Sequence, residues 1–142
     1  MDYPAIFEPA GEGGFIVRFP DFDWGVTQGD TEHEAEEMAV DAIRTMIREL
    51  IRQGKEVPLP SKPRGRKYRF IRLSALDAAK TALYEVFRAS GVKKAELARR
   101  LGIPKTTVDR LFDLDNHSRL DHIEAAFAAL GKQIALEIRD AA

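Results

Sequence analysis

The spacing of apolar residues changes near Thr31 from the pattern of strands to the pattern of a helix. Before that point, Tyr3, Ala5 and Phe7 occupy alternate positions of residues 2–9, and residues 15–19 and 24–28 are rich in aromatic and β-branched residues. After it, one apolar stripe runs through residues 35–51 at the spacing of an amphipathic helix. We therefore expect strands and a helix that packs on them, which is the α+β class.

Local signals mark where these elements begin and end. Thr31 and Glu34 have the spacing of a capping box, in which a hydroxyl and a carboxylate bond free backbone N–H groups. Gly54 is expected to end the helix. Residues 56–66 hold three prolines and a glycine and are expected to be extended, and residues 67–73 alternate as a fourth strand.

The rest of the chain is expected to form a small helical bundle with a terminal strand. Ser74 caps its first helix, and the predicted helices span residues 75–89, 93–101, 105–113 and 120–130. Residues 133–138 alternate as a strand that pairs either within its own chain or between two chains. The predicted units are residues 1–61 with their last strand at about 67–73, a basic linker at 62–66, and a helical unit at 74–142.

The net charge of −1 conceals an uneven distribution of charge. Residues 1–61 carry 5 basic and 13 acidic side chains, residues 62–73 carry 6 basic and no acidic ones, and residues 74–142 carry 11 and 10. This asymmetry indicates partners of different kinds. The chain has no cysteine, which excludes disulfides and cysteine nucleophiles and fits a reducing compartment. We expect a cytoplasmic protein without a signal peptide or a membrane span.

Residues 96–112, ELARRLGIPKTTVDRLF, meet the mechanical demands of a helix-turn-helix. Ala98 lets two helices cross closely, and Gly102 permits the positive φ of the turn. Five apolar residues would hold the pair on the bundle: Leu97, Leu101, Ile103, Val108 and Leu111. The alternative is an ordinary helical hairpin, but the presence of all these features together favours a DNA-binding motif.

This stretch, continued by IEAAFAALGKQI, resembles the Xre/Cro-type helix-turn-helix family. The resemblance implies base-edge and phosphate contacts to DNA, which fall on Lys94, Lys105, Thr106 and Arg110. Arg119 is expected to neutralise a phosphate, with a solvated surface as the alternative. Lys93 and Pro104 depart from the family, which usually has a capping residue and a hydroxyl there. The small net charge of the unit predicts modest affinity per subunit, and so a homodimer or higher even oligomer on operator DNA.

Several short motifs follow one another in the first half of the chain. They are Tyr3-Pro4, Gly13-Gly14-Phe15, Phe19-Pro20-Asp21, Thr27-Gln28-Gly29-Asp30-Thr31, Glu34-Ala35 and the PLPS of residues 58–61. Together they resemble the HicB family of antitoxins. The resemblance implies a β-β-β-α-β module like a partial RNase H fold, without working nuclease carboxylates. It also implies a partner, the HicA toxin, which is a small ribonuclease that cleaves mRNA.

An acidic module is a suitable inhibitor of a protein that grips RNA, because such a protein must be basic. The expected toxin contacts are Asp21, Phe22, Asp23, Trp24 and Asp30. Trp24 is the expected anchor, since tryptophan often dominates binding energy at interfaces, with a place in the sheet core as the alternative. The carboxylates near Thr31 have their own alternative role, because the start of a helix favours negative charge.

The sequence offers little that indicates catalysis. Asp21, Asp23 and Asp30 would suit Mg²⁺, but their spacing is weak evidence for a metal site. The three histidines are scattered, and no phosphate loop or Ser-His-Asp grouping is present. We expect no enzyme activity, cofactor or metal. The predicted function is an antitoxin that represses its own operon and is nucleoid-associated when bound to operator. The alternative is a stand-alone repressor whose first module senses a ligand or dimerises.

Overall fold

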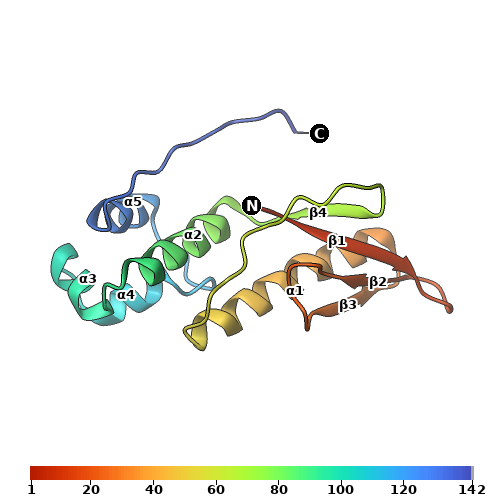
Figure 1. Ribbon diagram of the computed structural model, residues 1–142, viewed down its shortest axis with the longest axis horizontal. Coiled ribbons are helices and arrows are strands. Elements are labelled where there is room, and N and C mark those ends of the chain that lie inside the picture. Colours follow the sequence, from red (N-terminus) through yellow and green to blue (C-terminus); the bar gives the residue numbers. More distant parts are fainter. Residues whose placement is uncertain (142) are drawn as a thin grey trace.

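The computed structural model describes residues 1–141 and contains one sheet and five helices (Figure 1). The strands β1 (Asp2–Pro9), β2 (Phe15–Arg18), β3 (Val26–Gly29) and β4 (Tyr68–Arg72) are antiparallel, in the order β3-β2-β1-β4. The helices are α1 (Glu32–Arg52), α2 (Ala75–Ser90), α3 (Lys94–Leu101), α4 (Lys105–Leu111) and α5 (Leu120–Ala129). The predicted α+β class is confirmed, with each predicted helix within two residues of its observed bounds. None of the helices in residues 1–141 is long and apolar enough to cross a membrane.

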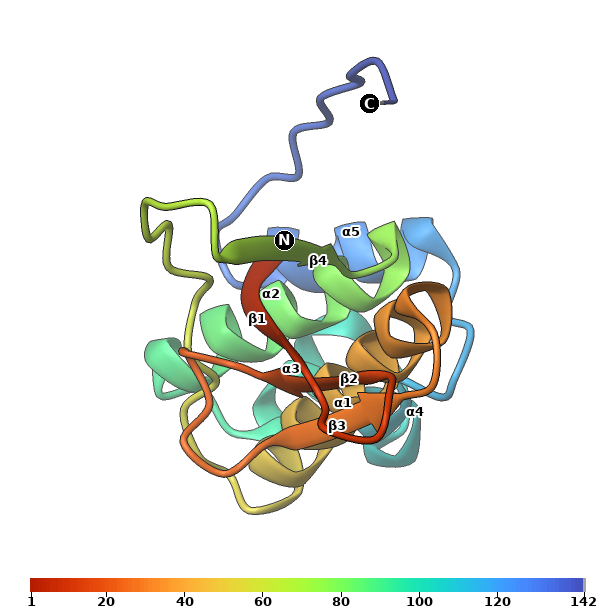
Figure 2. The same cartoon turned by 90° about the vertical axis from the view of Figure 1, so that its right-hand side faces the viewer.

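Helix α1 covers one face of the sheet (Figures 1 and 2). The Thr31 hydroxyl accepts a hydrogen bond from the Glu34 N–H at 3.1 Å, as predicted. The Glu34 carboxylate accepts from the Asp30 N–H at 3.3 Å, one residue earlier than in a capping box. The side chains buried between sheet and helix are Tyr3, Ala5, Val17, Ile71, Ala35, Ala39, Ile43 and Ile47. The buried residues Ala35, Ala39, Ile43 and Ile47 of the apolar stripe therefore face the sheet.

Gly29 allows the start of α1 to lie directly against β3. A Cβ atom on Gly29 would lie 2.4 Å from the backbone nitrogen of Ala35 and 2.7 Å from its Cα. We expect Gly29→Ala to lower the free energy of unfolding by about 1–3 kcal/mol, because backbone atoms would have to move apart. Urea denaturation monitored by circular dichroism measures this change.

The control for this prediction is Gly11→Ala, which adds the same methyl group in the β1–β2 turn. No atom lies within 4 Å of a Cβ on Gly11, so its effect should stay within about 0.5 kcal/mol. Equal destabilisation by both substitutions would contradict the explanation from close approach.

Helices α2–α5 form a bundle beside the sheet layer. Its core contains Leu83, Leu97, Val108 and Ile123, which are fully buried. Ser74 caps α2 through the Asp77 N–H at 3.1 Å, as predicted. Gly91 and Gly102 follow α2 and α3 with φ of 72° and 65°, the left-handed conformation that ends a helix.

Arginines of α1 join the sheet layer to the bundle. The Arg44 Nε donates to the Asp77 carboxylate of α2 at 2.8 Å, and an Arg44 terminal nitrogen donates to the Leu114 carbonyl at 3.2 Å. Arg48 donates to Asp115, in the α4–α5 loop, at 2.6 Å. The hydrogen bond from Arg48 holds the pKa of Asp115 below its usual value against the opposing effect of burial. These contacts set the orientation of α1 relative to the α4–α5 loop.

The predicted terminal strand at residues 133–138 is wrong for the single chain. These residues belong to no sheet within residues 1–141 and are extended and largely exposed (Figure 2). Alternating apolar residues indicate an extended amphipathic segment. To form a strand, the segment also needs a neighbouring strand that hydrogen-bonds its backbone N–H and C=O groups. Pairing within its own chain, one of the two expected arrangements, does not occur.

Candidate functional site

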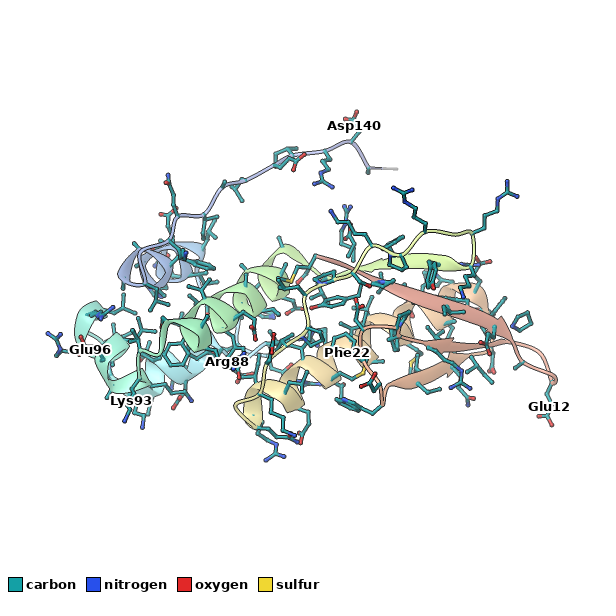
Figure 3. The ribbon with its side chains drawn as sticks, in the orientation of Figure 1. Glu12, Phe22, Arg88, Lys93, Glu96 and Asp140 are labelled. Atoms are coloured by element: carbon teal, nitrogen blue, oxygen red, sulfur yellow. The ribbon has the colours of Figure 1, made fainter. Side chains whose placement is uncertain are left out.

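The loop between β2 and β3 holds most of the predicted toxin contacts, but the structure gives them different surroundings. The Asp21 carboxylate accepts hydrogen bonds from Ser61, from its hydroxyl at 2.6 Å and its N–H at 2.9 Å. Phe22 is 4% exposed and packs on Tyr3 with ring centroids 5.2 Å apart (Figure 3). Asp21 and Phe22 therefore tie this loop to the PLPS segment and to the core.

Trp24 projects from the same loop and is 54% exposed, so it does not belong to the sheet core. Together with Val26 it forms one wall of a groove whose other wall is α1. The groove has a volume of about 280 Å³, and its lining residues are Trp24, Gly25, Val26, Thr27, Met38, Asp41, Ala42, Thr45 and Met46. We call it the Trp24 groove.

Acidic side chains accompany the Trp24 groove. Asp41 lines it, and the exposed Asp23 precedes Trp24 in the chain. Asp30 is exposed at the start of α1 and does not line the groove. A groove with a tryptophan wall and nearby carboxylates is suited to a partner with an apolar side chain among basic ones.

Sequence reasoning missed the α1 wall of the Trp24 groove. Met38 belongs to the apolar stripe by its spacing, yet it is 39% exposed. Asp41 and Thr45 lie one turn apart on the same helix. The sequence does carry a signal, because Met38 is followed at helical spacing by the polar residues Asp41 and Thr45. This change from apolar to polar marks where the sheet stops covering α1.

Helix α4 presents an exposed face at the opposite end of the molecule from the β1–β2 turn. Figure 3 shows Lys93, at the start of α3, far from Glu12 in that turn. The exposed side chains on α4 are Lys105, Thr106, Asp109 and Arg110, which share one face by their spacing. Neither α3 nor α4 has a side-chain cap, in keeping with Lys93 and Pro104 at their cap positions.

Ion pairs reduce the free positive charge near α4. Lys94, the residue predicted to contact a phosphate, pairs with Asp109 of α4 at 2.8 Å. Arg119 pairs with Asp121 at 3.0 Å. No carboxylate within residues 1–141 pairs with Lys105 or Arg110, so these two cations are available to a ligand.

A buried lysine holds the end of α4 in place. Lys80 of α2 has no exposed surface, and its ammonium group donates to the carbonyls of Arg110 and Asp113 at 2.7 and 2.8 Å. Its third hydrogen bond goes to the Ser118 hydroxyl at 2.8 Å. Burial lowers the pKa of Lys80 from its ordinary value. Lys80 thus satisfies backbone oxygens at the C-terminal end of α4, where a helix favours positive charge.

The three aspartates considered for Mg²⁺ do not form a metal site. Asp21 faces Ser61, while Asp30 lies at the start of α1. Within residues 1–141, no group of three histidine or carboxylate side chains is placed to hold a metal ion.

Comparison with known proteins identifies the family. A family model described as HicB_like antitoxin of bacterial toxin-antitoxin system matches residues 2–82. Antitoxin HicB 1 of Photorhabdus laumondii is 39% identical over 138 residues, which cover 97% of this chain and 87% of that protein. The chain belongs to the HicB family of antitoxins. Antitoxin HicB of Escherichia coli K12 is also 39% identical, over 96% of this chain and 98% of its own.

The part of the chain matched to the HicB family model contains the complete sheet, α1 and the Trp24 groove. The full-length HicB relatives extend the similarity through α3, α4 and α5. A chain of a toxin–antitoxin complex from Streptococcus pneumoniae is 32% identical, with a TM-score of 0.41, over 44% of this chain and 45% of that chain. The HicB family consists of antitoxins and not of enzymes.

Proposed function

We propose that this HicB family member neutralises a HicA-like, mRNA-cleaving toxin with residues 1–61 and the β4 segment at 67–73. Residues 74–142 would bind operator DNA and dimerise, so that the protein represses its own operon, and residues 62–66 would link the two units. The observation that carries this proposal is the family similarity, which runs along almost the whole chain. It favours an antitoxin over a stand-alone repressor. The protein would act in the cytoplasm and associate with the nucleoid when bound to operator.

The Trp24 groove is the proposed toxin surface. A toxin that binds RNA presents basic side chains, and the sheet layer with α1 is the acidic part of this chain. Trp24 and Met38 are large, exposed apolar residues on facing walls, which suits an anchor residue from the partner. Asp23, Asp41 and Asp30 would attract the basic surface around that anchor. Asp21 and Phe22 would hold the loop in shape without direct contact.

The exposed face of α4 is the proposed DNA-reading surface. Lys105, Thr106 and Arg110 would contact base edges. Lys94 and Arg119 would contact phosphates, and their ion pairs with Asp109 and Asp121 would break when DNA binds. A two-fold dimer would bring two such helices to half-sites about 34–36 Å apart. We expect toxin and DNA to bind at the same time, because no residue that lines the Trp24 groove belongs to α4.

We expect the reading frame next to this gene to encode a short, basic protein, and its expression tests the antitoxin function. We expect it to arrest growth and cut mRNA, and co-expression of this chain to restore growth and intact transcripts. The two proteins should also co-purify. A harmless neighbour, or a toxic one that this chain neither binds nor counteracts, would contradict the proposal.

Arg110→Ala tests the DNA-reading face. We expect it to cost about 1–3 kcal/mol at one operator position, because the lost contact distinguishes one base pair from the others. Binding to a set of operator variants, measured by fluorescence anisotropy, checks this expectation. Toxin affinity serves as the internal control and should not change. Equal losses on every DNA sequence would instead make Arg110 a phosphate contact.

A further inference from the structure

The loop that leads into β4 carries positive charge that the proposed function does not use. Its exposed cations are Lys62, Arg64, Arg66 and Lys67. Within residues 1–141, no carboxylate pairs with any of these four side chains. We call residues 62–67 the basic loop. It lies at the β4 end of the molecule, whereas α3 and α4 lie at the other end (Figure 1). Its charge would repel a basic toxin, and its position separates it from the DNA-reading face.

Strand β4 presents two aromatic rings on the face of the sheet that α1 does not cover. Arg69 points toward α1, where it pairs with Glu36 at 3.4 Å. Side chains alternate along a strand, so Tyr68, Phe70 and Arg72 lie on the opposite face. We call these three side chains the β4 face. Phe70 is 47% exposed, so a large apolar ring stands in solvent beside the basic loop.

Two carboxylates lie on the same side of the sheet, and each has an arginine partner. Arg72 pairs with Asp2 of β1 at 3.0 Å, and Arg18 of β2 pairs with Glu8 of β1 at 3.8 Å. These pairs cancel in charge. The net positive charge of this region is therefore that of the basic loop.

We infer that the β4 face and the basic loop bind single-stranded nucleic acid, of which RNA is the ordinary form in a cell. Side chains two residues apart on a strand lie about 7 Å apart, so Tyr68 and Phe70 can each stack on one base of an extended chain. The Lys67 ammonium lies 5.1 Å from the centre of the Tyr68 ring, so the cations of the loop begin beside the rings and would contact the phosphates. Stacking on a side chain needs an unpaired base, which favours a single strand over a duplex.

This nucleic-acid surface is separate from the toxin and operator surfaces of the proposed function. Neither the Trp24 groove nor α4 contains a residue of the basic loop or of the β4 face. In the strand order β3-β2-β1-β4, Val26 of the Trp24 groove belongs to one edge strand and β4 is the other. RNA and toxin would therefore bind at opposite edges of the sheet.

Fluorescence anisotropy of the full-length chain with a labelled RNA of about ten nucleotides tests the stacking. We expect the single strand to bind more tightly than the same RNA annealed to its complement. Phe70→Leu should weaken single-strand binding about 10-fold, because leucine keeps an apolar side chain but has no ring to stack on a base. Phe70→Tyr, which keeps the ring, should retain the affinity. Equal affinity for single strand and duplex, or a Phe70→Leu variant that binds as the wild type does, would overturn the inference.

A salt series with the same RNA tests the phosphate contacts. Arg64→Gln with Arg66→Gln should weaken binding, and the slope of log affinity against log salt should fall by about 1.4, or about 0.7 for each lost contact. Lys55→Gln with Lys132→Gln is the matched control, because it removes two exposed cations that also lack a carboxylate partner within residues 1–141. This control should keep the wild-type slope. Equal slopes for the two double variants would contradict a specific role of the basic loop.

Photocrosslinking locates the bound strand. With 4-thiouridine in the RNA, mass spectrometry should find the modified peptide around Phe70. A crosslink confined to α4 would overturn the inference, since the RNA would then occupy the DNA-reading face. Single-stranded DNA of the same sequence separates the two sources of this ligand, because tighter binding of RNA assigns the surface to RNA and tighter binding of DNA assigns it to single-stranded DNA.

These outcomes are separable from the proposed function, because the RNA measurements use neither toxin nor operator. If toxin neutralisation fails while the single strand binds as expected, the antitoxin proposal is wrong and the nucleic-acid surface stands. If this chain neutralises the toxin and binds no single strand, only the nucleic-acid surface is wrong.

Discussion

Lys80→Met is expected to lower the free energy of unfolding by about 2–4 kcal/mol, because it removes the donor for three oxygen atoms inside the bundle. Methionine fills a similar space but donates no hydrogen bond. The Arg110 carbonyl would keep the Asp113 N–H at 3.3 Å, and the Asp113 carbonyl would keep the Asn116 N–H at 3.1 Å. Both would lose the charged donor, whose hydrogen bonds are stronger than those of a neutral N–H. Urea denaturation measures the loss.

The control is Lys62→Met, which removes an exposed lysine from the basic linker and should change stability by less than about 0.5 kcal/mol. The Lys80 variant should also lose operator affinity, since the end of α4 is no longer held. A Lys80→Met protein as stable as the wild type would show that the hydrogen bonds of Lys80 add no net stability.

The same side chain predicts a dependence on pH. Burial lowers the pKa of Lys80 in the folded protein below its unfolded value, so the unfolded chain binds this proton more tightly. Stability then rises with pH across the interval between the two pKa values. The free energy of unfolding of the wild type minus that of Lys80→Met should therefore rise with pH in the alkaline range. The titrations of the other side chains cancel in this difference.

Local chemistry made much of the fold predictable. Thr31 and Ser74 accept from backbone N–H groups three residues on, and Gly91 and Gly102 end their helices in the left-handed conformation. Such signals depend on a few neighbouring residues, so they can be recognised without knowledge of the tertiary structure. The resemblance to the HicB family rested on similarly local motifs, and Gly29 shows the physical reason for one of them.

The candidate toxin surface was only partly predictable, because burial depends on what lies across from a residue. Phe22 stands between two aspartates, which suggests exposure, yet it fills the space beside the Tyr3 ring. Met38 has the spacing of a core residue, but the sheet does not extend far enough to cover it. Hydrophobic spacing tells which face of a helix is apolar and not how much of that face a short sheet can cover.

Residues 133–138 failed as a predicted strand for a related reason. Their alternation indicates only an extended amphipathic segment. A strand also needs a neighbouring strand to pair with, and the segment's own sequence does not specify that neighbour. A partner chain is one such neighbour, which no pattern within the segment can reveal.

Asp23→Lys combined with Trp24→Ala is expected to weaken toxin binding by at least about 30-fold, or about 2 kcal/mol, because it removes the proposed anchor and reverses a neighbouring charge. The fold should be unaffected, since both side chains are exposed. Operator affinity should also be retained, because α4 is untouched. Calorimetry with a catalytically inactive toxin variant measures the affinity, and the association rate should fall most at low salt.

The matched control makes comparable changes elsewhere in the same module. Glu12→Lys with Phe70→Ala reverses one exposed charge and truncates one exposed aromatic ring, in the β1–β2 turn and on β4. If the Trp24 groove is the toxin surface, this control binds the toxin as the wild type does. If the control loses affinity and the Asp23→Lys/Trp24→Ala variant does not, the toxin lies over the hairpin and β4 instead. Because both variants shift the net charge equally, a difference between them reflects position and not overall electrostatics.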